Sequence, residues 1–493
     1  MSAFALLAPA GITVAGALLC LGAEPFLGPE RKHRVLPWTA AFALLAAIAA
    51  VALAPLAGDH LHLAGLYALD PVRFWLVGAV LAAGAVGVAG IQQSLSRDRF
   101  PGGEPYALAL FAVAGAVLMV QACDALALFV GLEITSLAVY ALVGLRRHRS
   151  ESNEALFKYF VMGAVFSAIF LYGTALVYGA TGSTRFGQVA LDGRDQLWLL
   201  GHGLMVIALL FKVGAVPFHT WAPDAYTGAP VAVTGLMGAI VKVGGFTALG
   251  ALWLNMASAL SGQPATALSL ATTLVPSESA RGVLLPFSLV FVLLAVLSIA
   301  IGNLSALKQT SVRRIVAFSS VAHAGFMLFI FVLPATGQGF GLQPLWLYLV
   351  AYALATATTL TAVAGLSGGD DAHDDIDSLA GQGRLQPLHG LCLTISLAAT
   401  AGIPPTLGFL GKFAVLANLV AAGPLWWAWA AVAMVLAVVG AIYYLRLIVA
   451  LWVAEPKRPA LAGDGLLATW AIVLAAVALI VLIAVPNLIA PTA

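Results

Sequence analysis

The sequence contains few charged residues. Only 9% of its 493 residues are charged, whereas 62% are hydrophobic. A soluble protein has about a quarter charged residues, so the charges here are too few to cover a surface exposed to water. Lipid must therefore surround most of the molecule, and we expect an integral membrane protein. The formal net charge of +2 gives no indication of a nucleic-acid partner.

Cysteine is also scarce. Cys20, Cys123 and Cys392 lie far apart in apolar stretches, without a C-x-x-C pair. This spacing argues against an iron–sulfur cluster, a zinc site or a covalent haem. The nine histidines lack the paired spacing on one helix that bis-histidine haem ligation needs. No P-loop, dinucleotide glycine fingerprint or nucleophile elbow is present. We therefore expect no cofactor, no metal and no redox centre on this chain.

Long apolar segments fill the sequence. A bilayer core needs about 20 apolar residues per helix. This criterion predicts an all-α polytopic membrane protein of about fourteen transmembrane helices, with approximate spans 4–23, 37–57, 73–94, 106–123, 125–145, 155–178, 197–216, 229–253, 283–302, 313–333, 343–366, 387–410, 425–451 and 466–487. The apolar start of the chain has no basic segment, so we interpret it as the first span and not as a cleaved signal peptide.

The distribution of arginine and lysine over the loops predicts the orientation. With the N-terminus outside, the basic residues in outside loops are only Arg73, Arg185, Arg194 and Arg281. The remaining loop arginines and lysines are all cytoplasmic. The positive-inside rule then places both termini outside.

Two of the spans contain helix-breaking prolines. The seventh span runs into Pro217, and the twelfth contains Pro404 and Pro405. Proline removes a backbone donor and clashes with the preceding turn. Because the two breaks are five spans apart, we expect two five-helix repeats, spans 4–8 and 9–13, which the odd number of helices makes inverted. The expected divisions are 1–105 (three helices), 106–253 (first repeat), 283–451 (second repeat) and 452–493 (span 14).

A single carboxylate lies deep in a span. Glu133 follows Asp124 by nine residues, which is roughly 13 Å along a helix and so near the middle of a core of about 30 Å. Ser136 and Tyr140 share its face. A lone carboxylate at this depth costs several kcal/mol unless it is paired or protonated. We interpret Glu133 as a protonation site, and the alternative is a structural ion pair.

Four lysines also lie inside spans: Lys158, Lys212, Lys242 and Lys412. Burial destabilises the ammonium form and a nearby carboxylate stabilises it, so such lysines can load and release a proton. We interpret Lys212, Lys242 and Lys412 with Glu133 as a proton relay. Lys158 is close enough to the end of its span to reach the interface instead.

Two histidines are further candidates. His219 follows the break at Pro217, and His323 lies inside span 10. A buried histidine is often a hydrogen-bonded core residue, but its near-neutral titration also suits proton transfer. The acidic stretch from Asp370 to Asp377 resembles a metal site in composition, and we interpret it as a solvated loop.

Several stretches resemble one known family. They are G-L-E-I-T-S-L-A-V-Y-A-L-V-G (131–144), S-N-E-A-L-F-K-Y-F-V-M-G-A (152–164), F-K-V-G-A-V-P-F-H-T-W-A-P-D-A-Y-T-G-A-P (211–230), R-R-I-V-A-F-S-S-V-A-H-A-G (313–325), A-G-I-P-P-T-L-G-F-L-G-K-F (401–413) and Y-Y-L-R (443–446). They are similar to the subunit N family of bacterial NADH-quinone oxidoreductase, respiratory complex I, whose mitochondrial equivalent is NADH dehydrogenase subunit 2. The resemblance covers spans 4 to 13, and the first three spans match in pattern more than in residues.

The resemblance implies a proton-translocating, antiporter-like subunit of the membrane arm, driven by quinone reduction elsewhere in the complex. The family's relay glutamate falls on Glu133, and its relay lysines fall on Lys158, Lys212, Lys242 and Lys412. In the family, Glu133 would pair with Lys212, and charge separation would drive a proton toward Lys412.

The resemblance also implies the cofactors and partners. NADH, FMN, iron–sulfur clusters and quinone belong to other subunits, so this chain is part of an enzyme without carrying its substrate-oxidising site. The expected partners are the antiporter-like subunits M and L, small subunits such as K, and lipids. The expected location is the bacterial inner (plasma) membrane, with both termini periplasmic.

Other interpretations stay open. Subunit L would have a long lateral helix and more spans after span 14, and subunit M usually has a glutamate where Lys412 stands. A subunit of a cation/proton antiporter or of a membrane-bound hydrogenase would share most of these residues. A stand-alone secondary transporter would need a substrate pocket at the broken helices. A passive scaffold would tolerate loss of Glu133 or Lys242.

Overall fold

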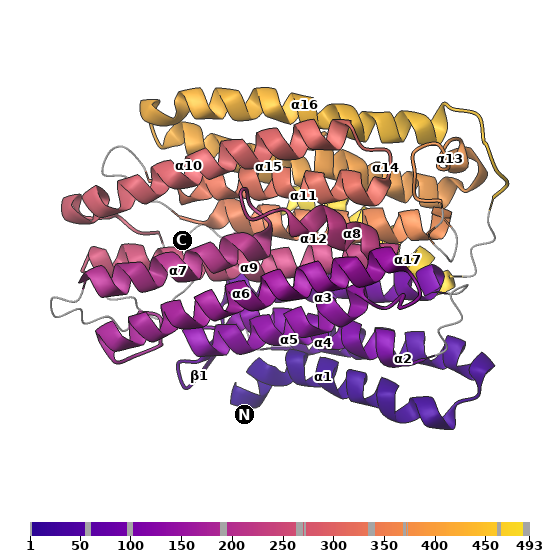
Figure 1. Cartoon of the computed structure of the whole chain (residues 1–493), viewed down its shortest axis with the longest axis horizontal. Coiled ribbons are helices and arrows are strands. Elements are labelled where there is room, and N and C mark those ends of the chain that lie inside the picture. Colours follow the sequence, from indigo (N-terminus) through magenta and orange to yellow (C-terminus); the bar gives the residue numbers. More distant parts are fainter. Residues whose placement is uncertain are drawn as a thin grey trace.

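The computed structural model describes residues 2–54, 61–95, 102–187, 195–262, 270, 273–333, 341–367, 371, 373–460 and 465–486. In this part of the chain, helices lie side by side along one common direction (Figure 1). The N-terminal elements are α1 Ser2–Ala23, α2 Pro29–Ala52, the antiparallel hairpin of β1 Leu61–Leu63 and β2 Tyr67–Leu69, and α3 Pro71–Leu95.

The elements of the two expected repeats follow. The first group is α4 Glu104–Gln121, α5 Ala125–Val143, α6 Ser150–Thr181, α7 Asp195–Val213, α8 Trp221–Gly228 and α9 Val231–Leu260. The second group is α10 Glu278–Leu307, α11 Val312–Leu328, α12 Gln343–Ser367, α13 Gln382–Leu385, α14 Pro387–Ala401, α15 Leu407–Ala421 and α16 Trp427–Trp452. The last helix is α17 Leu466–Val481, and the short 3-10 helices are η1 Glu24–Phe26, η2 Phe329–Phe331, η3 Pro424–Trp426 and η4 Leu482–Ala484.

These helices confirm the predicted all-α membrane fold. Within the described residues, 13 helices are long and apolar enough to cross a membrane. The twelfth span is divided between α14 and α15, each too short to cross alone, and it completes the fourteen expected spans. Spans 4 and 5, which the sequence separates poorly, are divided at Asp124. Its carboxylate accepts hydrogen bonds from the backbone of Leu126 (2.8 Å) and Ala127 (3.0 Å) and so caps the start of α5.

The same pairs of helices pack together in both halves of the molecule. In the first half α4 packs on α5 and α9, and α6 packs on α7. In the second half α10 packs on α11 and α16, and α12 packs on α14 and α15. The correspondence is what two five-helix repeats require. The boundaries expected for the four divisions, 1–105, 106–253, 283–451 and 452–493, stay a prediction.

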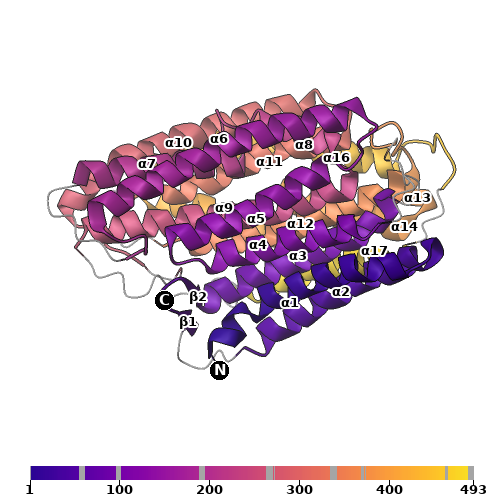
Figure 2. The same cartoon turned by 60° about the horizontal axis from the view of Figure 1, so that its bottom comes forward.

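α9 and α12 form the centre of the molecule. They pack against each other (Figure 2), and their apolar segments are entirely buried, unlike those of the peripheral helices α6, α16 and α17. A helix that is apolar on every side is stable only when other helices surround it or lipid does. A polar side chain on α9 or α12 must therefore find its partners inside the protein.

Both helix breaks follow the same local pattern. α7 ends before Gly214 (φ +69°) and α14 ends before Gly402 (φ +82°), a left-handed conformation that favours glycine after a helix. The Val216–Pro217 and Pro404–Pro405 peptide bonds that follow are cis. At each break a side chain donates to backbone carbonyls at the end of the helix. Near the first break, the indole of Trp221 donates to the carbonyl of Phe211 at 3.0 Å.

Candidate functional site

Glu133 lies on α5 and faces α6. It is partly buried, and its Oε1 accepts a hydrogen bond of 2.5 Å from the hydroxyl of Ser167. Ser136 follows one turn later on the same face, as the spacing predicts. The carboxylate thus lies at the start of a polar strip on α5.

Lys212 occupies the last turn of α7, just before the break. The residue is 3% exposed, and its Nζ donates to Ser136 Oγ at 2.6 Å. The rings of Tyr140 and Tyr159 lie 5.5 and 5.8 Å from this nitrogen, within the range of cation–π attraction. Gly163 makes room for this arrangement, because a Cβ there would lie 1.8 Å from the hydroxyl of Tyr140. The ammonium therefore has a hydroxyl partner and two aromatic faces, deep in the bilayer.

Glu133 and Lys212 are coupled without direct contact. Among the described ion pairs none joins them, so the direct pairing that the family resemblance implied is replaced by two separate serine contacts. A cavity of about 10 Å³ is lined in part by Ser167, the partner of Glu133, and by Lys212. This is about the space that one water needs. The carboxylate also acts on the ammonium through space.

Lys242 lies in the middle of the central helix α9. The residue is 4% exposed, and its Nζ donates to both the carbonyl and the hydroxyl of Ser320, the latter at 2.7 Å. The hydroxyl of Tyr226 is 3.3 Å from the same Ser320 hydroxyl, and the ring of Tyr352 lies 5.1 Å from the ammonium. No carboxylate in the described part of the chain lies within ion-pair distance of Lys242, so its proton is held by hydroxyl and carbonyl oxygens.

The two lysines approach the same short stretch of α9. A Cβ at Gly245, one turn after Lys242, would lie 4.0 Å from Cγ of Lys212. A Cβ at Gly238, one turn before Lys242, would lie 2.8 Å from the hydroxyl of Tyr226. Small residues on both sides of Lys242 therefore bring the α7 lysine and the α8 tyrosine close to it.

His323 lies on α11 one turn after Ser319. Its Nδ1 is 2.7 Å from the hydroxyl of Tyr348, and its Nε2 is 3.0 Å from the hydroxyl of Tyr444. Tyr444 also bonds to Ser319. The imidazole is within electrostatic range of both Lys242 and Lys412. The structure therefore brings His323 between the two predicted relay lysines.

Lys412 is the last member of the row. It lies on α15 directly after the second helix break, and its Nζ donates to the carbonyls of Thr400 (2.7 Å) and Ala401 (3.0 Å). These are the carbonyls that the end of α14 leaves free. The ring of Phe326 lies 5.3 Å from the ammonium, and Lys412 and His323 border the same gap, which is too small for a water molecule. The break thus supplies the oxygen partners of the lysine.

Two sequence candidates lie outside this row. Lys158 is 46% exposed and pairs with Glu154 (2.6 Å) and Asp224 (2.9 Å) near the end of its span. This is the interfacial position that the sequence offered as the alternative to a place in the relay. His219 lies in the break after Pro217. Its Nδ1 has no hydrogen-bond partner among the described residues.

Sequence reasoning identified Tyr140 but not the other tyrosines of the row. Tyr348 and Tyr352 are one turn apart on α12, and Tyr226 lies within the seventh-span motif without having been singled out. The sequence signal that could have identified Tyr348 and Tyr352 is a pair of hydroxyl-bearing residues at helical spacing in a span without charged residues. Tyr444 was visible only as part of Y-Y-L-R.

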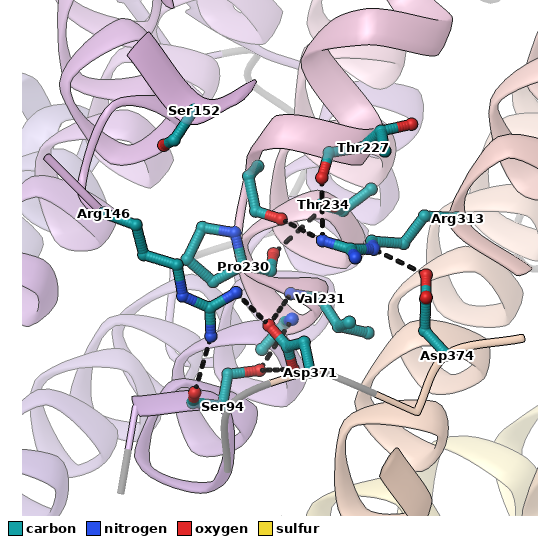
Figure 3. A network of polar contacts seen from close by, with 12 residues as sticks. Ser94, Arg146, Ser152, Thr227, Pro230, Val231, Thr234, Arg313, Asp371 and Asp374 are labelled. Atoms are coloured by element: carbon teal, nitrogen blue, oxygen red, sulfur yellow. Dashed lines mark hydrogen bonds and ion pairs between the residues drawn. The ribbon is translucent and has the colours of Figure 1, made fainter. Parts of the chain in front are cut away.

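A second polar network lies at the elbow between α8 and α9 (Figure 3). Arg313 Nε donates to Asp374 at 2.6 Å, while its Nη1 donates to the carbonyls of Thr227 (2.8 Å) and Ala229 (2.9 Å). The guanidinium therefore occupies the C-terminal end of α8. A cation is favourable at that end of a helix, where carbonyls are left free.

Asp371 holds the other side of the elbow. Its Oδ2 accepts from the backbone of Val231 at 2.9 Å, at the N-terminus of α9, and pairs with Arg146 at 2.7 Å. Ser94 joins this network, because its hydroxyl donates to Asp371 at 3.3 Å and accepts from Ala232 at 3.1 Å. Burial raises the pKa of the Asp371 carboxyl, and Arg146 opposes that effect.

The acidic stretch is therefore only partly the solvated loop that the sequence suggested, because Asp377 is exposed but two other carboxylates are buried. Asp371 is 2% exposed and Asp374 is 9% exposed, and each pairs with an arginine. Asp370 lies outside the described residues. The described histidine, cysteine and acidic side chains include no group of three that could hold a metal ion. Charge alone could not reveal this role, since the arginine partners are distant in sequence.

We predict that Asp371→Ala destabilises the protein strongly, because Arg146 is then buried without its carboxylate, at a cost of about 3–5 kcal/mol. The measurement is the unfolding temperature of the purified protein in detergent. Asp377→Asn is the matched control, since this aspartate pairs with Lys457 at the surface, where both side chains are mostly exposed. Equal unfolding temperatures for the two variants would show that the elbow does not depend on Asp371.

Comparison with known proteins places this geometry in a family. The family model described as "NADH:quinone oxidoreductase/Mrp antiporter, TM" matches residues 122–282 and 263–439. NADH-quinone oxidoreductase subunit N of Neisseria gonorrhoeae is 38% identical over 74% of this chain and 71% of its own length. The subunit N of Saccharopolyspora erythraea is 34% identical over 98% and 96%. A chain of respiratory complex I from Thermus thermophilus, solved with bound aureothin, is 31% identical, with a TM-score of 0.78 and 98% of both chains covered.

Proposed function

Because this chain belongs to the NADH:quinone oxidoreductase/Mrp antiporter family, and its relatives are subunit N, we propose that it is the proton-translocating, antiporter-like subunit of the membrane arm of an NADH:quinone oxidoreductase. One observation supports the mechanism most strongly. A row of ionisable side chains crosses the interior, each bonded to a hydroxyl or a carbonyl oxygen: Glu133, Lys212, Lys242, His323 and Lys412.

The row has the chemistry of a proton relay. Serine and tyrosine hydroxyls can both accept and donate a proton, so each can pass one between neighbouring amines. Ser136 stands beside Lys212, Ser320 beside Lys242, and Tyr444 beside His323. Water in the small cavity between Ser167 and Lys212 would connect the carboxylate to the first amine.

Glu133 is the control element of the proposed relay. Its negative charge stabilises the Lys212 ammonium through space. When a proton neutralises Glu133, or the carboxylate moves away, Lys212 loses that stabilisation and releases its proton toward Lys242. Lys242 is poised to pass a proton on, because no carboxylate of the described residues holds its charge. His323 and Lys412 complete the path in the second repeat.

The energy for this movement comes from elsewhere in the complex. In our proposal, quinone reduction and NADH oxidation occur on other subunits, which hold the FMN and the iron–sulfur clusters. The chain sits in the bacterial inner membrane with both termini periplasmic, beside antiporter-like subunits such as M and L and small subunits such as K. Its relatives' names support the enzyme complex as a whole.

A stand-alone transporter for a small solute is less well supported. In the described region, the cavity beside Lys212 has a volume of about 10 Å³, which is too small for a solute. The large cavity of this chain is apolar and lies between other helices. A cation/proton antiporter complex would keep the relay but change the partners.

We predict that Glu133→Gln and Lys212→Ala each reduce NADH-driven proton pumping by at least about five-fold, a small part of the roughly 100-fold that a positioned proton-transfer group contributes. Inverted membrane vesicles, with pumping followed by a pH-sensitive dye and NADH oxidation followed in parallel, provide the measurement. Lys308→Ala is the control, because this lysine is exposed and outside the row. Wild-type pumping in both relay variants, with normal assembly, would exclude the relay.

A second prediction concerns the partners. An affinity-tagged chain, purified from its own membranes in mild detergent, is expected to bring down the NADH-oxidising peripheral subunits. This result separates the oxidoreductase from the antiporter, because an antiporter complex has no such subunits. Purification with antiporter subunits alone would overturn the assignment while leaving the relay residues untouched.

A further inference from the structure

A large apolar groove runs along the face of the molecule formed by α2, α3 and α17, with α12 contributing to its floor. These helices are neighbours (Figure 2). The groove has a volume of about 610 Å³. Its lining side chains are almost all apolar and include Trp38, Leu45, Gly78, Ala82, Trp470 and Leu474. Of these helices only α12 also contributes side chains to the row, and the groove is not used by the proposed mechanism.

The groove is long and follows the membrane normal. On α2 its lining extends from Trp38 to Ala52, which at 1.5 Å per residue is about 21 Å, compared with a hydrocarbon core of about 30 Å. On α3 its wall consists mainly of small residues. A Cβ at Gly78 would meet no atom within 4 Å. A slot of this shape suits an extended hydrocarbon chain and not a compact ligand.

The α2 wall of the groove has a regular pattern. Five of the lining residues, Trp38, Ala41, Leu45, Ile48 and Ala52, are spaced by three and four residues, and Val51 lies beside the last of them. This is the spacing of one face of a helix. Continued toward the start of α2, the same face reaches Arg34 and then Arg31. Two arginines therefore extend the apolar wall at one end.

Both arginines are available to a ligand. Arg31 and Arg34 are exposed, and within the described chain neither guanidinium has a hydrogen-bond or ion-pair partner. Lys32, in the same turn, is different because it pairs with Glu24 at 3.4 Å. Trp38 is 43% exposed and Trp470 is 59% exposed at the groove. Tryptophan is enriched at the level of lipid headgroups.

We propose that this groove is a binding site for an anionic phospholipid. One acyl chain lies in the slot between α2, α3 and α17, and the phosphate lies against Arg31 and Arg34. A guanidinium forms charge-assisted, often bidentate hydrogen bonds with phosphate. Basic residues beside transmembrane helices are a recurrent recognition element for anionic lipids. The apolar length and the paired cations are thus explained by one ligand.

A helix of a neighbouring subunit is the main competing occupant. It would cover the apolar wall, but it would leave the two guanidiniums without a partner unless it also presented acidic residues there. A neutral lipid would fill the slot and gain nothing from Arg31 and Arg34. The test therefore has to separate acyl-chain occupancy from phosphate recognition.

The experiment uses the complete complex in vesicles of phosphatidylethanolamine with a trace of phosphatidylglycerol that carries a photoactivatable group in its acyl chain. After illumination, labelled peptides are mapped. We expect labelling concentrated on α2, α3 and α17. In Arg31→Gln/Arg34→Gln, this labelling should fall by at least about ten-fold, since each basic residue contributes several-fold to anionic-lipid binding. Lys32→Gln should behave as wild type.

Gly78→Phe provides a second, independent variant. The new side chain points into open space in the groove and not into the protein, so the fold is retained while the slot is filled. We expect loss of labelling although both arginines are present. Equal labelling of α6, α10 and α16, labelling unchanged in both variants, or a cross-link from the groove to another polypeptide would each overturn the proposal.

Discussion

A positive charge in the bilayer interior needs oxygen partners, and an unbroken helix offers few of them. Most helical carbonyls are already bonded within their own helix, and the hydrocarbon core of the bilayer offers none. Lys242 uses the hydroxyl and carbonyl of Ser320, and Lys412 uses the carbonyls of Thr400 and Ala401 that the second helix break releases. None of these contacts is a tight ion pair. Each buried amine therefore needs oxygen partners that can also exchange a proton. The broken helices, the small residues around Lys242 and the tyrosines all serve this one requirement.

The elbow between α8 and α9 connects the buried row to the loop beyond α12. Arg313 holds the end of α8 and Asp371 holds the start of α9. Tyr226 lies on α8, and Lys242 lies on α9, so both sides of the Ser320 contact depend on the position of this elbow. The two repeats meet here, because Arg313 belongs to α11 and the carbonyls it bonds belong to the end of α8 and the residue after it. A structural ion-pair network thus fixes the geometry of a site whose own members carry few ion pairs.

Most of the fold could be predicted from the sequence, because apolar length and proline position are local properties. All fourteen spans follow from counting residues against the thickness of a bilayer, and both breaks follow from the positions of Pro217, Pro404 and Pro405. The failures involve contacts between distant segments. Asp371 and Asp374 of the acidic loop are buried because Arg146 and Arg313 reach them, and no local pattern records that. The tyrosines joined the row only when packing placed α12 and α16 beside α11.

The central claim is that Glu133, Lys212, Lys242, His323 and Lys412 form one continuous proton path. An electron cryomicroscopy map of the assembled complex, at a resolution that shows ordered water, tests it most directly. We expect water or hydroxyl groups to join each neighbouring pair at hydrogen-bonding distance. An apolar gap wider than one water between Lys212 and Lys242, or between His323 and Lys412, present in every state of turnover, would contradict the claim.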